Sequence, residues 1–244
     1  MKYDYEKMTA DELNDLCDKL LTGADGVEKD VSEAVAVSKI AAEMGDAKAQ
    51  FSYACFLLDG KDVERDDAAA GDYWRRSAAQ GYAHSVNRLG ICALHGICGE
   101  NKDPVRAAEY FKLAADAGLP DAMFNLCMLY DSGVGVEKDA ENAYNYMKMA
   151  ADKKFPAACV LFGMKLAFES ASSQEDREKG AEYILTAAEA GNHDGEMLCA
   201  VCCEKGIGVE KDLSEAAGWY RRAAKAGNVQ ANGALKRLGF PGVM

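Results

Sequence analysis

A repeat of about 36 residues runs along the chain and constrains its fold more than any other feature of the sequence. The strings AAEMG, AAQG, AADAG, AADKK, AAEAG and AAKAG end in steps of 36 or 37, at Gly45, Gly81, Gly118, Lys154, Gly191 and Gly227. The pentapeptide GVEKD occurs at residues 26–30, 135–139 and 208–212, close to multiples of this step. Such a period predicts a tandem array of units, each burying its apolar face against its neighbours.

An aspartate and a mostly aromatic position recur before each string. The aspartates are Asp30, Asp67, Asp103, Asp139, Asp176 and Asp212, and seven residues after them stand Val37, Trp74, Tyr110, Tyr146, Tyr183 and Trp219. An aspartate at a helix N-cap accepts hydrogen bonds from free backbone N–H groups and meets the positive end of the helix dipole. We expect each aspartate to begin a helix, and each terminal glycine to end it in a left-handed conformation.

Each unit should also contain an earlier helix. Four residues after the terminal glycine comes a small residue and four later a mostly large one, as in Ala49 with Tyr53, which places them on one helical face. The turn to the second helix is expected at Gly23, Gly60, Gly96, Gly133 and Gly206. Thr9 with Glu12 has the spacing of an opening capping box. Residues 229–238 are expected to form a single closing helix that covers the apolar core face of the last repeat.

The unit resembles the Sel1-like repeat. The fullest copy is AMFNLCMLYDSGVGVEKDAENAYNYMKMAADKK from Ala122, and GIGVEKDLSEAAGWYRRAAKAG from Gly206 matches the second half well. The resemblance covers roughly residues 9–239 and implies an all-α fold: an α/α solenoid, wound as a right-handed superhelix, with about six helix pairs and a C-terminal capping helix. It also implies an adaptor or scaffold rather than an enzyme. Two units depart from the pattern: the turn FESASSQED lacks both glycines, and the first unit has one extra turn residue and Val37 in place of the aromatic.

The repeats define one domain over residues 1–244. Their expected bounds are 9–45, 46–81, 82–118, 119–154, 155–191 and 192–227, followed by a cap at 228–239.

Composition and charge exclude several classes of partner. The formal net charge of −12 argues against nucleic acid, which needs clustered Lys and Arg, and against anionic membrane surfaces. The N-terminal stretch MKYDYEKMTADEL lacks the apolar region of a signal peptide, and no apolar run is long enough to span a membrane. We therefore expect a cytoplasmic protein with nine free thiols.

Three alternative chemistries have some basis in the sequence. Gly133-Val134-Gly135 and Gly206-Ile207-Gly208 could suggest phosphate loops, but the aspartate that follows puts a negative charge at the helix start. Cys92, His95 and Cys98 could begin a metal or redox site, although no fourth zinc ligand is obvious nearby. Cys199, Cys202 and Cys203 are expected to be core residues.

Some Sel1-like proteins have been linked to penicillin binding, which leaves a small-molecule or β-lactam-binding enzyme as an alternative. The chain has no S-x-x-K, G-x-S-x-G or H-x-x-x-H motif, so no catalytic residue, metal or cofactor is assigned.

A partner is expected on the first helices. By analogy with tetratricopeptide arrays, the groove positions are Phe51, Asn87, Ile91, Phe124, Met128, Met164, Met197, Val201 and Arg237. This set is apolar and rich in methionine, which suits a surface that receives a peptide or protein segment. The alternative is that these residues are buried between adjacent first helices. Flanking acids, namely Asp121, Asp131, Asp194 and Glu204, would favour a ligand with basic flanks, and self-association is also possible.

Overall fold

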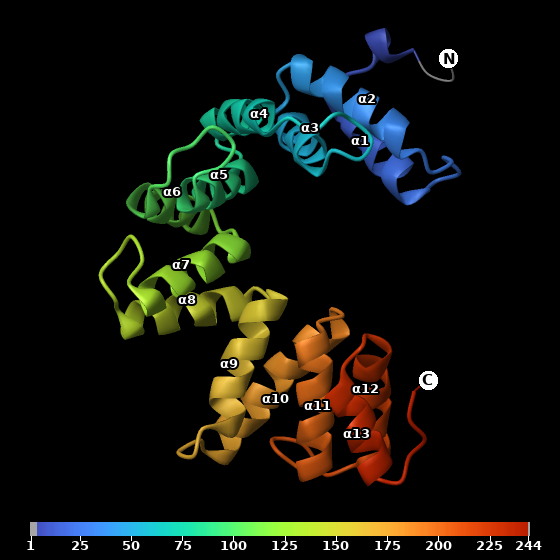
Figure 1. Ribbon diagram of the computed structural model, residues 1–244, viewed down its shortest axis with the longest axis vertical. Coiled ribbons are helices and arrows are strands. Elements are labelled where there is room, and N and C mark those ends of the chain that lie inside the picture. Colours follow the sequence, from blue (N-terminus) through green and yellow to red (C-terminus); the bar gives the residue numbers. More distant parts are fainter. Residues whose placement is uncertain (1–3, 244) are drawn as a thin grey trace. The chain divides into compact units, whose positions relative to one another are not determined.

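Helices make up almost all regular structure in residues 4–243, the range that the computed structural model describes (Figure 1). Residues 1–3, which begin the stretch inspected for a signal peptide, and Met244 at the end of the expected domain lie outside it. A short 3-10 helix, Tyr5–Lys7, precedes α1 (Ala10–Thr22), α2 (Val31–Glu43), α3 (Ala47–Asp59), α4 (Asp67–Ala79), α5 (Ala83–His95), α6 (Pro104–Asp116), α7 (Pro120–Ser132), α8 (Ala140–Asp152), α9 (Pro156–Phe168), α10 (Gln174–Glu189), α11 (His193–Lys205), α12 (Leu213–Lys225) and α13 (Val229–Arg237). The expected all-α fold of helix pairs with a lone last helix is confirmed.

The chain divides into two compact units. Unit 1 runs up to Ala122 and includes Ser132–Lys138, whereas unit 2 consists of Met123–Asp131 and the chain from Asp139 onward. In unit 1, helices α1 to α6 pack in chain order, each against the next. In unit 2, α8 to α13 do the same. This sequential packing, in which a helix contacts mainly its neighbours along the chain, is the organisation of a repeat array.

Polar caps begin most of the helices, as the sequence predicted. Thr9 and Glu12 form the full capping box, in which the Thr9 N–H donates to Glu12 Oε2 at 2.8 Å and the Glu12 N–H donates to Thr9 Oγ1 at 3.3 Å. The expected aspartates Asp30, Asp103, Asp139 and Asp212 are N-caps, and each accepts a backbone N–H within 3.0 Å. These bonds satisfy donors that the helix itself leaves without partners.

The predicted N-cap Asp67 is wrong by one residue. The N-cap of α4 is Asp66, whose Oδ1 accepts from the Ala69 N–H at 2.9 Å. The cause is Ser77, which stands where the other strings have their first alanine, so that the first alanine of AAQG lies one position later in the repeat than its apparent counterparts. The same displacement affects Trp74. Tyr73 occupies the half-buried position of Tyr110, whereas Trp74 occupies the following, buried position.

The predicted N-cap Asp176 is also wrong. Ser173 caps α10, and Asp176 is the third helical residue, closing a capping box in which the Ser173 N–H donates to Asp176 Oδ2 at 3.1 Å. The turn FESASSQED has no glycine to end α9 in a left-handed conformation, and Glu169 after α9 is extended. As a result α10 begins earlier than its counterparts and has 16 residues.

The cap of α4 gives a direct test of the corrected register. Asp66→Ala should lower the free energy of unfolding by about 1 kcal/mol, because it removes the acceptor of the Ala69 N–H. Asp67→Ala removes an exposed ion pair with Arg65 and should have a much smaller effect. Urea unfolding followed by circular dichroism measures both variants. Equal losses, or a larger loss for Asp67→Ala, would contradict the assignment of Asp66 as the cap.

Two of the GVEKD glycines lie against the backbone of the preceding second helix. A Cβ atom at Gly208 would lie 2.0 Å from the carbonyl oxygen of Arg177 in α10, and one at Gly135 would lie 2.1 Å from that of Pro104 in α6. Both glycines have positive φ, +69° and +74°. The pentapeptide thus combines a left-handed turn, a close backbone contact and a capping aspartate, and this accounts for its repetition without a ligand.

One large side chain from each of α4, α6, α8, α10 and α12 lies at the same point in the repeat. The five residues are Trp74, Phe111, Met147, Ile184 and Tyr220. Four of them are almost fully buried, with exposed fractions of 1% or less. Met147 is only half-buried. The packing above α8 is therefore more open than elsewhere in the series.

Candidate functional site

The cysteine clusters do not form a metal site among residues 4–243. Cys92 and Cys98 are buried and His95 is exposed, and no group of three or more His, Cys, Asp or Glu side chains within this range could hold a metal ion. Burial raises the pKa of the Cys92 and Cys98 thiols. A raised pKa keeps a thiol protonated at neutral pH and makes it a poor nucleophile or ligand.

The second cysteine cluster lies in the core of unit 2, as the sequence predicted. Cys199, Cys202 and Cys203 are all buried. Burial raises the pKa of Cys199 and Cys202 to about 12 and that of Cys203 to about 11. They pack as small apolar side chains.

The groove positions predicted in unit 1 are half-buried or buried against neighbouring residues. The Phe51 ring lies against Tyr82 and His84, with centroids 5.5 and 5.7 Å away. Asn87 is buried at 6% exposure, and Ile91 is half-buried. For Asn87, the alternative of burial against neighbouring helices describes its surroundings better than an open groove.

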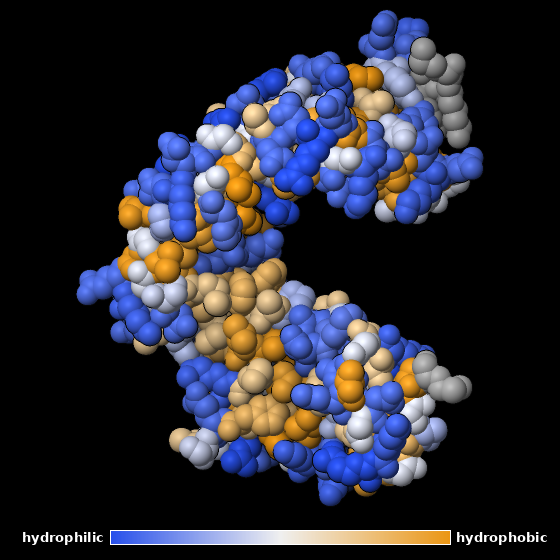
Figure 2. Space-filling model, in the orientation of Figure 1, coloured by the Kyte–Doolittle hydropathy of each residue, from blue (hydrophilic) through white to orange (hydrophobic). Residues whose placement is uncertain are grey.

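In unit 2, two predicted methionines lie in the same cavity. Met128 of α7 and Met164 of α9 face a pocket of about 600 Å³ whose floor is α8. The lining residues are mostly apolar: Cys127, Met128, Asp131, Ala140, Ala143, Tyr144, Met147, Leu161, Met164, Lys165, Phe168 and Glu169. Figure 2 shows hydrophobic side chains gathered over the part of the molecule that contains α7, α8 and α9. We call this cavity the methionine pocket.

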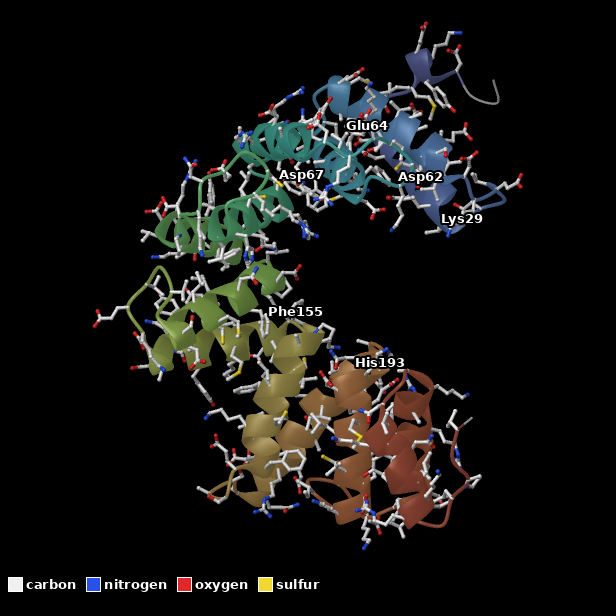
Figure 3. The ribbon with its side chains drawn as sticks, in the orientation of Figure 1. Lys29, Asp62, Glu64, Asp67, Phe155 and His193 are labelled. Carbon is white, nitrogen blue, oxygen red and sulfur yellow. The ribbon has the colours of Figure 1, made fainter. Side chains whose placement is uncertain are left out.

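Phe124 lies near this region but does not line the pocket. Its ring packs against Phe155, with centroids 5.3 Å apart, in the segment between α8 and α9 (Figure 3). Phe124 is half-buried and packs against the residue that precedes α9.

The other three predicted groove residues lie in a second, smaller cavity of unit 2. Met197 and Val201 of α11 and Arg237 of α13 line a pocket of about 290 Å³, with Tyr220 of α12 among its walls. The Arg237 guanidinium donates to both carboxylate oxygens of Glu204, at 2.7 and 2.8 Å, and the Tyr220 hydroxyl donates to Glu204 at 2.6 Å. Burial is the main cause that raises the pKa of Tyr220, and its hydrogen bond to Glu204 is the second. We call this cavity the arginine pocket.

Several lining residues of the methionine pocket were missed by the sequence analysis. Leu161 and Phe168 are exposed at 40% and 37%, and Tyr144 forms part of the wall with the Lys165 ammonium 6.0 Å from its ring centroid. The signal was present in α9, whose sequence PAACVLFGMKLAF is apolar on nearly all sides. A helix that cannot bury all its apolar residues in the core exposes some of them.

Comparison with known proteins establishes the family. A model of the Sel1 repeat matches residues 13–46, 47–82, 83–119, 120–155, 165–192 and 194–228. The chain belongs to the Sel1 repeat family. Its fold is that of Sel1 repeat solenoids, because it superimposes on the crystal structure of a Sel1 repeat protein from Oxalobacter formigenes with a TM-score of 0.83 and 27% identity, over 96% of this chain and 67% of that one.

Longer relatives are similar over most of this Sel1 repeat chain. It is 25% identical to chitin synthase regulatory factor 2 of Schizosaccharomyces pombe, over 91% of this chain and 38% of the relative. It is 30% identical to DAP3-binding cell death enhancer 1 of Rattus norvegicus, over 71% of this chain and 34% of the relative. The chain thus spans little more than a third of the length of either relative. Among the described residues, no helix has both the length and the apolar character needed to cross a bilayer.

Proposed function

We propose that this Sel1 repeat chain is a non-enzymatic scaffold that binds an apolar segment of a partner protein in the methionine pocket. The observation that carries the proposal is a cavity of about 600 Å³ between α7, α8 and α9 with exposed methionines on two walls. Pockets of this size and apolar character commonly bind ligands, and flexible methionine side chains adapt to protein surfaces of varied shape. A peptide helix or strand could place its apolar side chains there.

The family supports a protein partner. Sel1 repeat proteins are generally interaction scaffolds, and the names of the two relatives describe a regulatory factor and a protein that binds another protein. We extend to this chain only the class of function, a scaffold for a protein segment. We also place it in the cytoplasm, where its nine free cysteines would remain reduced.

A selection from a phage-displayed random peptide library tests the pocket. Met128 and Met164 are 46% and 41% exposed, so a double change to aspartate should fold while placing two charges in the cavity. We expect peptides enriched on the wild-type chain to bind the double variant at least about 30-fold more weakly, which corresponds to about 2 kcal/mol.

Met149 supplies a matched control. It lies on α8, is 45% exposed and does not line the pocket. Met149→Asp should retain the selected peptides, and circular dichroism should show equal helix content in all three proteins. Selected peptides that bind the double variant as tightly as the wild type would overturn the site.

A further inference from the structure

The methionine pocket and the arginine pocket occupy the same place in the repeat, 73 residues apart. Five lining positions correspond one to one: Met128 with Val201, Asp131 with Glu204, Met147 with Tyr220, Leu161 with Ala234, and Met164 with Arg237. Each pocket therefore has two first helices as walls and a second helix as floor. The two pockets have the same arrangement of helices and differ in the side chains that line them.

The carboxylate of the arginine pocket is fully satisfied by the chain itself. Glu204 accepts two bonds from Arg237 and one from Tyr220, all at 2.6–2.8 Å. Its side chain is only 15% exposed. A carboxylate that is partly removed from water is stabilised by such charge-assisted hydrogen bonds.

In the methionine pocket both of these partners are replaced by methionine. Met164 occupies the position that corresponds to Arg237, and Met147 occupies the position that corresponds to Tyr220. Neither methionine can donate a hydrogen bond to the carboxylate of Asp131. The carboxylate of Asp131 is exposed to solvent and makes no hydrogen bond or ion pair with another side chain in the described range. Asp131 thus shares its place in the repeat with Glu204, but no cation of the described chain pairs with it.

Lys165, the one basic residue among those that line the methionine pocket, already has a partner. The Lys165 ammonium lies 2.7 Å from Glu169 Oε1. Helices α7 and α9 both end next to pocket residues, at Ser132 and Phe168, and the carboxyl end of a helix carries partial negative charge. The amino end of α8 is neutralised by its own cap, Asp139. The electrostatic potential at this rim therefore favours a cation from outside.

We infer that the partner segment carries an arginine beside its apolar anchor and places the guanidinium against Asp131. The intermolecular ion pair formed in this way would correspond to the ion pair that Glu204 and Arg237 form within the chain. This inference rests on the proposed function, since the apolar anchor must first occupy the methionine pocket. The occupant is a short apolar peptide segment with one central basic residue. Arginine suits the place better than lysine because its planar guanidinium binds both carboxylate oxygens.

Three fluorescein-labelled peptides test the inference by fluorescence anisotropy. Each has two leucines on either side of a central residue, which is arginine, glutamine or glutamate. On the wild-type chain the arginine peptide should bind about three- to fivefold more tightly than the glutamine peptide, the range expected for a solvent-accessible ion pair. The glutamate peptide should bind most weakly, because its charge faces Asp131.

Two isosteric variants separate a local effect from the net charge of −12. Asp131→Asn and Glu204→Gln each remove one negative charge, but only the first should abolish the preference for arginine over glutamine. Met164→Arg should also abolish it, because it supplies the internal cation that the arginine pocket already has. Loss of the preference in Glu204→Gln but not in Asp131→Asn would overturn the inference.

The outcomes distinguish this inference from the proposed function. Equal binding of all three peptides, lost in the Met128→Asp/Met164→Asp double variant, would overturn the role of Asp131 and leave the apolar pocket supported. Binding of none of the peptides, or equal binding to the double variant, would overturn both. Preference for arginine that Asp131→Asn abolishes, together with loss of binding in the double variant, is the result that supports both.

Discussion

Gly208→Ala is expected to lower the free energy of unfolding of unit 2 by about 3 kcal/mol or more. The new Cβ would lie 2.0 Å from the carbonyl oxygen and 2.5 Å from the carbonyl carbon of Arg177, so the two backbone segments must separate by about 1 Å. The left-handed conformation at φ +69° adds a further cost of about 1 kcal/mol for a residue with a side chain. The first cost arises because GVEKD packs directly on α10, and the second arises from the backbone conformation of the turn.

Gly206→Ala is the matched control, two residues earlier in the same turn. Gly206 has φ +70°, but a Cβ there would lie 3.4 Å from its nearest neighbour, the Lys211 Cβ, which is ordinary contact. This variant should therefore lose only the conformational term, about 1 kcal/mol. Urea unfolding together with hydrogen exchange of α10 and α12 amides measures both, since an array need not unfold in one step.

The comparison tests whether the glycine of GVEKD is needed for packing or only for the turn. A larger loss of stability at Gly208 than at Gly206 shows that Gly208 is required for close packing against α10. Equal losses would mean that both glycines are needed only for their backbone conformation, and that the contact with Arg177 relaxes at little cost.

Repetition explains how much of the fold could be predicted. Six copies of one pattern make helix starts and ends visible that a single copy would not reveal, and Asp30, Asp103, Asp139 and Asp212 were placed correctly for that reason. The errors at Asp67 and Asp176 fell where a copy departs from the common pattern. In one string Ser77 replaces the first alanine, and one turn has lost its glycines, so that Ser173 became the cap. A register counted from neighbours cannot detect a local insertion, deletion or lengthened helix.

The candidate site was less predictable. Met128 and Met164 meet in one pocket because they occupy the same position in successive first helices, which the register supplies. Whether a cavity opens between them depends on the side chain beneath, and the half-buried Met147 could not be recognised as different from the buried Phe111 or Ile184 without coordinates. The missing partner of Asp131 likewise becomes visible only beside the Glu204–Arg237 pair.

Trp74→Ala is expected to be the most damaging single substitution in unit 1, at about 3–5 kcal/mol. The side chain is 1% exposed and belongs to the core formed by α1 to α5, so its truncation removes a large buried surface and leaves a cavity. Thermal and urea unfolding should both show the loss, and the helices nearest to α4 should lose hydrogen-exchange protection first.

Trp74→Phe separates the contribution of packing from that of the indole. The Trp74 Nε1 is buried and makes no hydrogen bond of normal geometry within the described range; the Cys55 sulfur lies near it, and sulfur is a weak acceptor. Replacing the indole by phenyl therefore removes apolar contacts but also removes a buried donor whose desolvation costs about 1–3 kcal/mol. The next repeat already holds Phe111 at this position with 1% exposure, so the backbone accepts a phenyl ring there. We expect Trp74→Phe to change stability by less than about 1.5 kcal/mol. A loss as large as that of Trp74→Ala would mean that the indole N–H is satisfied in solution and that packing at this position is specific to tryptophan.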